Sequence, residues 1–196
     1  MDQHTEKMNP RATVGADVVR IASVSEVLKV RGRYHAWCVD RFGREKWRDD
    51  IENTVCTAGK NLALDTILAG SSYTVVGPYM GLISSVSYSA IAAADTQASH
   101  AGWTEAGVTN APTYTIPRKT AVFSSAAAGA KALSSALAFA ITGSGTIKGC
   151  FLIYGTGALT TIDNTAGTLL SAGLFTGGDK VVANTDTVNV SWSLAL

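Results

Sequence analysis

Short strand-like runs, separated by turn residues, fill the chain after residue 71. Glycine-rich turns and an Asn-Thr-Asp turn recur between these runs, as is typical of strands joined in an antiparallel sheet. Short strands joined by tight turns predict a mainly β fold, an antiparallel β-sandwich of the jelly-roll kind. The predicted strands span residues 79–85, 102–105, 119–123, 136–141, 146–154, 169–175 and 187–194.

The large apolar side chains of these runs form the predicted core. We expect each of them to occupy an inward-facing strand position, where truncating one aromatic side chain costs about 3–5 kcal/mol. The residues concerned are Trp103, Phe123, Phe139, Phe151, Leu152, Phe175 and Trp192.

A charged hairpin is predicted over residues 33–52. Two runs, 33–40 and 45–52, flank a turn that contains Gly43. Alternation gives the hairpin one apolar face and one highly charged face. The residues that this pattern places on the apolar face are His35, Trp37, Val39, Trp47 and Ile51.

One short helix is predicted over residues 60–69. Leu64, Ile67 and Leu68 recur at helical spacing, and Gly70 stands where a helix C-cap belongs. The alanine-rich stretch 126–137 contains several serines and a glycine, so we expect a loop that leads into a strand.

The first 30 residues form a predicted N-terminal arm, which precedes a β-sandwich domain over residues 31–196. The apolar pieces of the arm are too short to build a core alone, so the arm is either a flexible tail or a segment that orders against a partner. Because all the predicted core residues lie later in the chain, we expect the sandwich to fold without the arm.

Charged residues are concentrated at the start of the chain. Residues 1–60 hold 11 of the 16 Lys and Arg and 9 of the 15 Asp and Glu, although the net charge of the whole chain is only +1. Residues 61–196 are therefore far poorer in charge than an average domain and expose Ser, Thr, Gly, Ala and Asn, which a neighbouring subunit covers at low desolvation cost. This distribution predicts a homo-oligomer, with a trimer as the expected state.

We expect the arm and the hairpin to be the docking element, because patches of mixed sign give a contact its specificity and register. Apolar residues of the arm would make contacts that exclude water, and the charged residues would set the orientation of the two partners. The candidate docking residues are Val18, Val19, Val27, Leu28, Arg33, Trp37, Arg41, Arg44, Trp47 and Arg48.

Catalytic chemistry finds little support in the sequence. Asp95, Ser99 and His100 lie within one Ser-rich loop, but no nucleophile-elbow pattern frames a serine. We expect Asp95 and His100 to bind local backbone groups beside a buried Trp103. We therefore predict that the protein is not an enzyme.

No cofactor or metal is predicted. The three histidines are scattered and lack ligand spacing, and no glycine motif of a nucleotide-binding loop opens a helix. Asp163, Asp179 and Asp186 lie in turns, and their meeting across space is the remaining possibility for a metal. Three cysteines without CxxC spacing predict no disulfide framework and synthesis in a reducing cytosol.

Some of the same residues also bear on whether nucleic acid, glycan or membrane is a partner. The hairpin combines arginines with Trp37, Phe42 and Trp47, as nucleic-acid-binding surfaces do, but its acidic residues largely neutralise it, so no nucleic-acid partner is expected. Exposed hydroxyls with scattered aromatics also suit a glycan-binding module, which stays an alternative. The N-terminus lacks the layout of a signal peptide, and no run approaches the length of a membrane span, so no membrane partner is expected.

Three segments carry a resemblance to a known family. They are 53–65 (NTVCTAGKNLALD), 79–105 with its motifs YMGLIS and SHAGWTE, and 149–190, which includes LLSAGLF and NTDTVNV. Over residues 33–196 the chain resembles small structural virion proteins of tailed bacteriophages. The resemblance implies a location in the virion after synthesis in the host cytoplasm, other virion proteins as partners, and no catalytic residues.

The place in the particle stays open at this point. A capsid decoration (cement) protein is the leading interpretation, because the chain is one compact domain without a receptor-binding extension. A neck, collar or tail component is the second, and a glycan-binding appendage is the third.

Overall fold

The structure is a computed structural model that describes residues 31–68 and 76–195. The predicted arm, residues 1–30, lies outside the described residues, as do its candidate docking residues Val18, Val19, Val27 and Leu28. The elements, in chain order, are β1 (Arg31–Val39), β2 (Glu45–Val55), α1 (Thr57–Leu68), β3 (Tyr79–Ser84), β4 (Thr113–Tyr114), β5 (Lys119–Thr120), β6 (Ala130–Ala132), β7 (Leu137–Gly143), β8 (Gly145–Tyr154), β9 (Thr168–Phe175), β10 (Lys180–Val182) and β11 (Thr187–Ala195).

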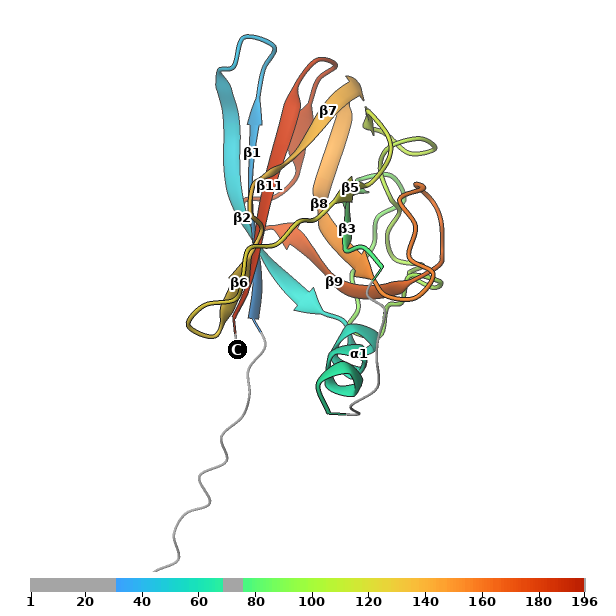
Figure 1. Ribbon diagram of the computed structural model, residues 1–196. Coiled ribbons are helices and arrows are strands. Elements are labelled where there is room, and N and C mark those ends of the chain that lie inside the picture. The colour runs from blue at the N-terminus through green and yellow to red at the C-terminus, as the bar shows by residue number, and fades with distance from the viewer. Residues whose placement is uncertain (1–30, 69–75, 196) are drawn as a thin grey trace, which may run out of the picture.

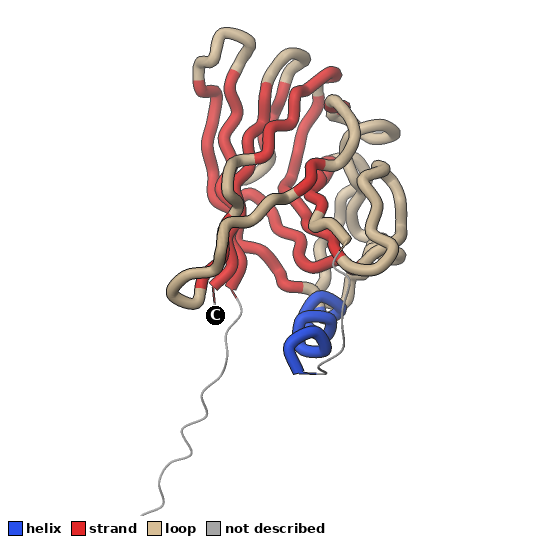
Figure 2. Tube along the Cα trace, viewed as in Figure 1, coloured by secondary structure: helices blue, strands red, loops and turns tan. Residues whose placement is uncertain are grey.

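One antiparallel sheet that curls on itself makes up most of the molecule (Figures 1 and 2). Its strand order is β4-β7-β11-β1-β2-β9-β8-β3-β5, with β10 added beside β8 and β6 beside β11. The prediction of a mainly β, antiparallel fold with one short helix is confirmed. The strands of the sequence-predicted hairpin lie in the middle of this sheet, since β1 pairs with β11 on one side and with β2 on the other.

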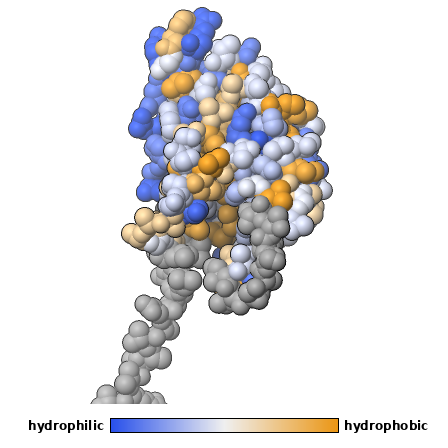
Figure 3. Space-filling model, viewed as in Figure 1, coloured by the Kyte–Doolittle hydropathy of each residue, from blue (hydrophilic) through white to orange (hydrophobic). Residues whose placement is uncertain are grey.

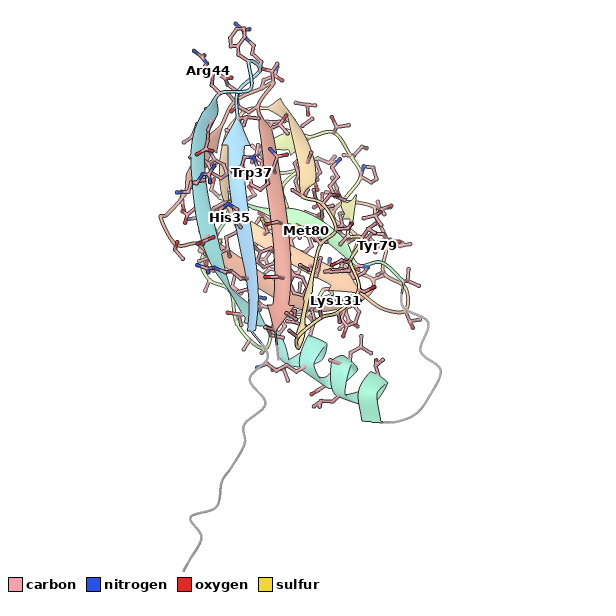
Figure 4. The ribbon with its side chains drawn as sticks, turned by 60° about the vertical axis from the view of Figure 1, so that its left-hand side comes forward. His35, Trp37, Arg44, Tyr79, Met80 and Lys131 are labelled. Atoms are coloured by element: carbon pink, nitrogen blue, oxygen red, sulfur yellow. The ribbon has the colours of Figure 1, made fainter. Side chains whose placement is uncertain are left out.

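The face assignment predicted for the first hairpin strand is wrong. Tyr34, Ala36 and Cys38 are fully buried, whereas His35 and Trp37 lie on the outer face (Figure 4). The outer face also carries the charged residues that pair with them across the strands, so it is the polar face of the hairpin. In β2 the prediction holds: Ile51 is fully buried and Trp47 packs against the core.

The concave face of the curled sheet holds the larger of two core clusters. Side chains from nine strands meet there, because alternate residues of each strand point to the same face. Trp192 lies 6.2 Å from Tyr34 and 5.5 Å from Phe123, measured between ring centroids. Of the predicted core residues, Phe139, Leu152, Phe175 and Trp192 belong to this cluster, and the half-buried Phe123 packs against it.

A second cluster lies on the opposite face of β3, β8 and β9, beneath a layer of loops. The loops between β3 and β4 and between β8 and β9 cover this face, on the right in Figure 1. Trp103 and Phe151 are buried here, with ring centroids 5.1 Å apart. Both are core residues as predicted, but Trp103 lies in a loop, so its predicted strand 102–105 is wrong apart from one bridge between Ile83 and Glu105.

Several helix and strand boundaries differ from those predicted. The helix begins at Thr57, three residues before the predicted start. The stretch 126–137 is not helical: it forms a tight turn and the short strand β6, paired with β11. The two-residue strand β4 and the three-residue strands β6 and β10 have no counterpart in the prediction, because such short runs carry no measurable alternation.

Asp49 ties β2 to the turn between β9 and β10. Its carboxylate accepts hydrogen bonds from Thr176 Oγ1 (2.7 Å) and Gly177 N (2.8 Å) and pairs with Lys180 Nζ at 2.6 Å. Burial acts to raise the pKa of Asp49, but these three donors outweigh it and hold the pKa below its ordinary value. Asp49 therefore stabilises the fold above its ordinary pKa near 4, and this stabilisation is lost as the pH falls through the lower folded-state pKa.

We expect Asp49→Asn to flatten the pH dependence of stability on the acid side. Urea unfolding at pH 7 and pH 3 measures it: the wild-type protein should lose more of its unfolding free energy between these pH values than the variant does. Asp179→Asn is the control, since that carboxylate is half-exposed and pairs with Lys148 at 2.9 Å. Equal losses in wild type and Asp49→Asn would contradict the proposed role of the carboxylate.

Candidate functional site

The tip of the first hairpin projects beyond the other strands and is internally ordered. Asp40 Oδ1 accepts hydrogen bonds from the backbone N–H groups of Phe42 (2.8 Å) and Arg44 (3.0 Å), and Asp40 Oδ2 accepts one from Arg44 Nε (2.8 Å). Gly43 has a φ of 77°, which a turn of this kind requires. The chain therefore holds the tip in one shape without help from a partner.

Phe42 is the exposed apolar residue of this tip. The residue is 66% exposed, and the guanidinium carbons of Arg41 and Arg44 lie 4.7 and 5.2 Å from its ring centroid. Figure 4 shows Arg44 at the tip, beyond the ends of the sheet. An ordered aromatic ring flanked by two arginines has the composition of an interface anchor, because aromatic residues and arginine dominate binding hot spots.

Below the tip, the outer hairpin face (Arg33, His35, Trp37, Arg48 and Asp50) carries charges of both signs. Asp50 pairs with Arg33 Nη2 at 2.7 Å and with His35 Nδ1 at 2.8 Å. The rings of His35 and Trp37 are 5.7 Å apart. Figure 3 shows hydrophilic residues gathered along this side of the molecule, on the left. Such partly neutralised pairs orient a contact more than they strengthen it.

The candidate docking residues that the structure describes thus fall into two groups. Arg33, Trp37, Arg41, Arg44 and Arg48 lie together on the outer side of the hairpin and its tip. Trp47 lies on the inner side: its ring is 5.3 Å from that of Phe175, and its Nε1 donates to Val181 O at 3.3 Å. We therefore leave Trp47 out of the docking surface.

An apolar groove of about 480 Å³ opens between α1 and the sheet. The sequence pattern did not reveal it, because its walls come from elements distant in the chain. Phe123, Leu170 and Leu194 are half-buried residues that pack on the concave core, so the groove exposes the flank of that core at the end of the molecule where β1 begins. The lining residues are Ala63, Thr66, Pro78, Phe123, Lys131, Leu152, Tyr154, Leu170, Trp192 and Leu194.

Asp95 and His100 fasten the loop around Trp103, as the sequence predicted. Asp95 Oδ2 accepts hydrogen bonds from Trp103 Nε1 (3.0 Å) and Ala92 N (2.9 Å). The His100 ring stacks on Trp103 at 3.9 Å, and its Nδ1 is 3.0 Å from Trp103 O. The carboxylate binds the indole and the imidazole binds a backbone carbonyl, so neither orients the other for proton transfer to Ser99.

A buried ion pair between Glu105 and Arg118 is the feature that the sequence analysis missed. Arg118 donates from Nε to Glu105 Oε1 (2.8 Å) and from Nη2 to Glu105 Oε2 (2.6 Å), and the two side chains are 0% and 3% exposed. Arg118 also binds the carbonyls of Leu159 and Asn164, and Glu105 Oε2 accepts from Asp163 N at 2.8 Å. Burial raises the pKa of Glu105, against the effect of these donors.

This pair connects the two covering loops and the chain before β5. Its donors and acceptors are matched: the carboxylate receives three hydrogen bonds, and the guanidinium makes four. A bidentate pair that is satisfied in this way is a structural clamp. Its signal in the sequence was faint: Glu105 stands alone in the charge-poor part of the chain, and Arg118 has one charged neighbour, Lys119.

The three turn carboxylates do not meet. Asp186 pairs with Lys46 Nζ at 2.5 Å, Asp179 pairs with Lys148, and Asp163 accepts from Thr109 Oγ1 at 2.7 Å. Within residues 31–68 and 76–195, no cluster of three His, Cys, Asp or Glu side chains that could hold a metal is present. No helix in the same residues has the length and apolar character needed to cross a membrane.

All three cysteines are free and buried. Burial raises the pKa of Cys56 to about 11 and that of Cys38 to about 12, and it also raises the pKa of Cys150. These thiols therefore stay protonated at neutral pH and behave as small apolar core residues.

Comparison of the chain with models of protein families, with curated proteins and with solved structures finds no match. The functional conclusion therefore depends on the sequence resemblance and on the two surfaces described above, the hairpin with its tip and the apolar groove.

Proposed function

We propose that the protein is a non-enzymatic structural component of a tailed-bacteriophage virion, and that it serves there as a capsid decoration protein in homo-oligomeric form. The observation that carries the proposal is the ordered hairpin tip, where Phe42 projects between Arg41 and Arg44. A tip held in shape by Asp40 loses little conformational entropy on binding, which favours a permanent contact.

The outer hairpin face and the charge-poor remainder of the surface support the same function. Mixed charges on the hairpin set the register of a contact, and hydroxyl-bearing surfaces are desolvated cheaply when copies pack together. The resemblance of residues 33–196 to small virion proteins supplies the biological setting.

Purified particles test the proposal directly. Phage carrying this gene are purified, and the protein is quantified by gel densitometry against the major capsid protein. Hundreds of copies per particle are expected of a decoration protein. A dozen copies or fewer would move the protein to the neck, collar or tail, and its absence from particles would refute a virion role.

We expect Phe42→Ala to reduce docking without weakening the fold. Loss of a hot-spot aromatic costs about 2 kcal/mol or more of binding free energy, which is roughly a 30-fold loss of affinity. Wild-type and variant protein are co-expressed during infection, and their ratio in purified particles is measured by mass spectrometry. The melting temperature should stay unchanged because the ring is exposed.

Val122→Ala is the matched control for the tip. Val122 is 60% exposed, close to the 66% of Phe42, but lies between β5 and β6, away from the hairpin. Equal incorporation of Phe42→Ala, Val122→Ala and wild type would rule out the tip as the docking contact.

A further inference from the structure

We propose that the apolar groove binds residues 26–30 of the same chain, Glu26-Val27-Leu28-Lys29-Val30. This inference goes beyond the structural role in the virion and does not depend on it. It starts from the place where the described chain begins. β1 starts at Arg31, and Gly32 pairs with Leu194, a residue of the groove wall. Figure 1 shows the start of β1 at the same end of the molecule as α1 and β6.

The alternation of β1 selects which residues of the segment face the groove. Tyr34 and Gly32 are cross-strand partners of Trp192 and Leu194, the two β11 residues that line the groove. In an extended chain, residues two apart share a face, so a segment docked in this conformation would direct Val30 and Leu28 to the groove and Lys29 and Val27 away from it. The segment thus offers two apolar side chains to the groove and its lysine to water.

The groove has room for these side chains and lacks other obvious occupants among the described residues. A cavity of about 150 Å³ takes one benzene-sized group, so 480 Å³ accommodates two aliphatic side chains with their backbone. Since an extended residue spans about 3.3–3.6 Å, Leu28 reaches roughly 10 Å from Arg31. A tethered segment also acts at a high effective concentration, which favours it over a free partner.

Two polar groups at this end of the sheet fit the same occupant. Lys131 lines the groove, and in the described chain no carboxylate pairs with its ammonium group, so Glu26, on the groove side by alternation, is a suitable partner. Asn53 is on the same face of the sheet, beside Gly32, and both polar atoms of its buried amide lack a hydrogen-bond partner. Backbone groups of a docked segment can satisfy such an amide.

Methyl NMR on the full-length protein tests the proposal. Nuclear Overhauser effects are expected between the methyl groups of Leu28 or Val30 and those of Leu152, Leu170 or Leu194. A second sample mixes copies labelled on the arm with copies labelled in the domain and detects only contacts between different chains. Contacts in the first sample that vanish in the second support the proposal.

Three outcomes would overturn it. Contacts that persist in the mixed sample would show that the arm of a second copy fills the groove. Contacts from residues 69–75, which connect α1 to β3, would assign the groove to that segment. Absence of any contact between residues 26–30 and the groove would show that the segment does not bind there.

Paired variants give an independent readout. Leu28→Asp with Val30→Asp should abolish the contacts, increase binding of the dye ANS several-fold, and lower the melting temperature by roughly 3–8 °C. Val27→Asp is the control, because Val27 faces away from the groove, and it should leave all three measurements unchanged. An equal effect of Val27→Asp would contradict the predicted alternation.

Discussion

Replacing Arg118 with methionine is expected to lower the free energy of unfolding by about 3–5 kcal/mol. The substitution keeps much of the side-chain volume but leaves the Glu105 carboxylate buried without its cation. It also removes the donors to Leu159 O and Asn164 O, so the loop between β8 and β9 loses two anchors. Urea denaturation followed by tryptophan fluorescence measures the change.

Two further variants separate the buried charge from the lost contacts. Lys148→Met breaks the partly exposed pair with Asp179 and should change stability by at most about 1 kcal/mol. Glu105→Gln combined with Arg118→Met should be more stable than Arg118→Met alone, because the unpaired buried charge has gone. A loss below about 1 kcal/mol for Arg118→Met would mean that the pair does not act as a clamp.

Truncating Phe151 to alanine is expected to cost about 3–5 kcal/mol. Phe151 is fully buried on β8, beneath Trp103, and faces Gly81 on the neighbouring strand β3. A Cβ at Gly81 would come within 2.4 Å of the ring, so the ring fills the space that this glycine leaves. The truncation opens a cavity between the sheet and the loop layer, which neither side can close easily.

The matched control for Phe151→Ala is Phe42→Ala, the same chemical change at an exposed ring. Differential scanning calorimetry should show a large drop in melting temperature for the first variant and none for the second. A cost below 1 kcal/mol for Phe151→Ala would show that the loop layer collapses onto the gap or contributes little to stability.

The sequence was most informative where strands are long and buried on the concave face. The runs that became β8, β9 and β11 were placed within about two residues of their ends, because long apolar runs bounded by clear turn residues leave little ambiguity. The predicted core aromatics of these strands are buried for the same reason.

Alternation predicted the wrong buried face for β1, because both faces of this strand carry apolar residues. Trp37 is much larger than Ala36, so side-chain size alone favoured the wrong face. The concave face accepts only small residues at positions such as Ala36 and Cys38, because Trp47, Phe175 and Trp192 from other strands already fill it. That crowding arises from pairing between strands that are distant in the chain, so the local sequence of β1 gives no sign of it.

The candidate surfaces were predictable only in part. The arginines and Phe42 of the hairpin tip follow from composition and from the glycine turn. The groove does not, since its walls come from α1, β6 and β11, which are far apart in the sequence. The Glu105–Arg118 clamp escaped prediction because the covering loops are ordered by hydrogen bonds between side chains and backbone, which leave no periodic pattern.

The pairing of β1 with β11 has a consequence for how the molecule is made. β1 is synthesised among the first of the described residues, yet one of its two neighbours consists of Thr187–Ala195. During translation the edge of β1 that pairs with β11 stays unpaired until β11 has been made. An unpaired strand edge can pair with other nascent chains. The sheet can close only once β11 has emerged from the ribosome, so protein expressed at high concentration should depend on chaperones until then.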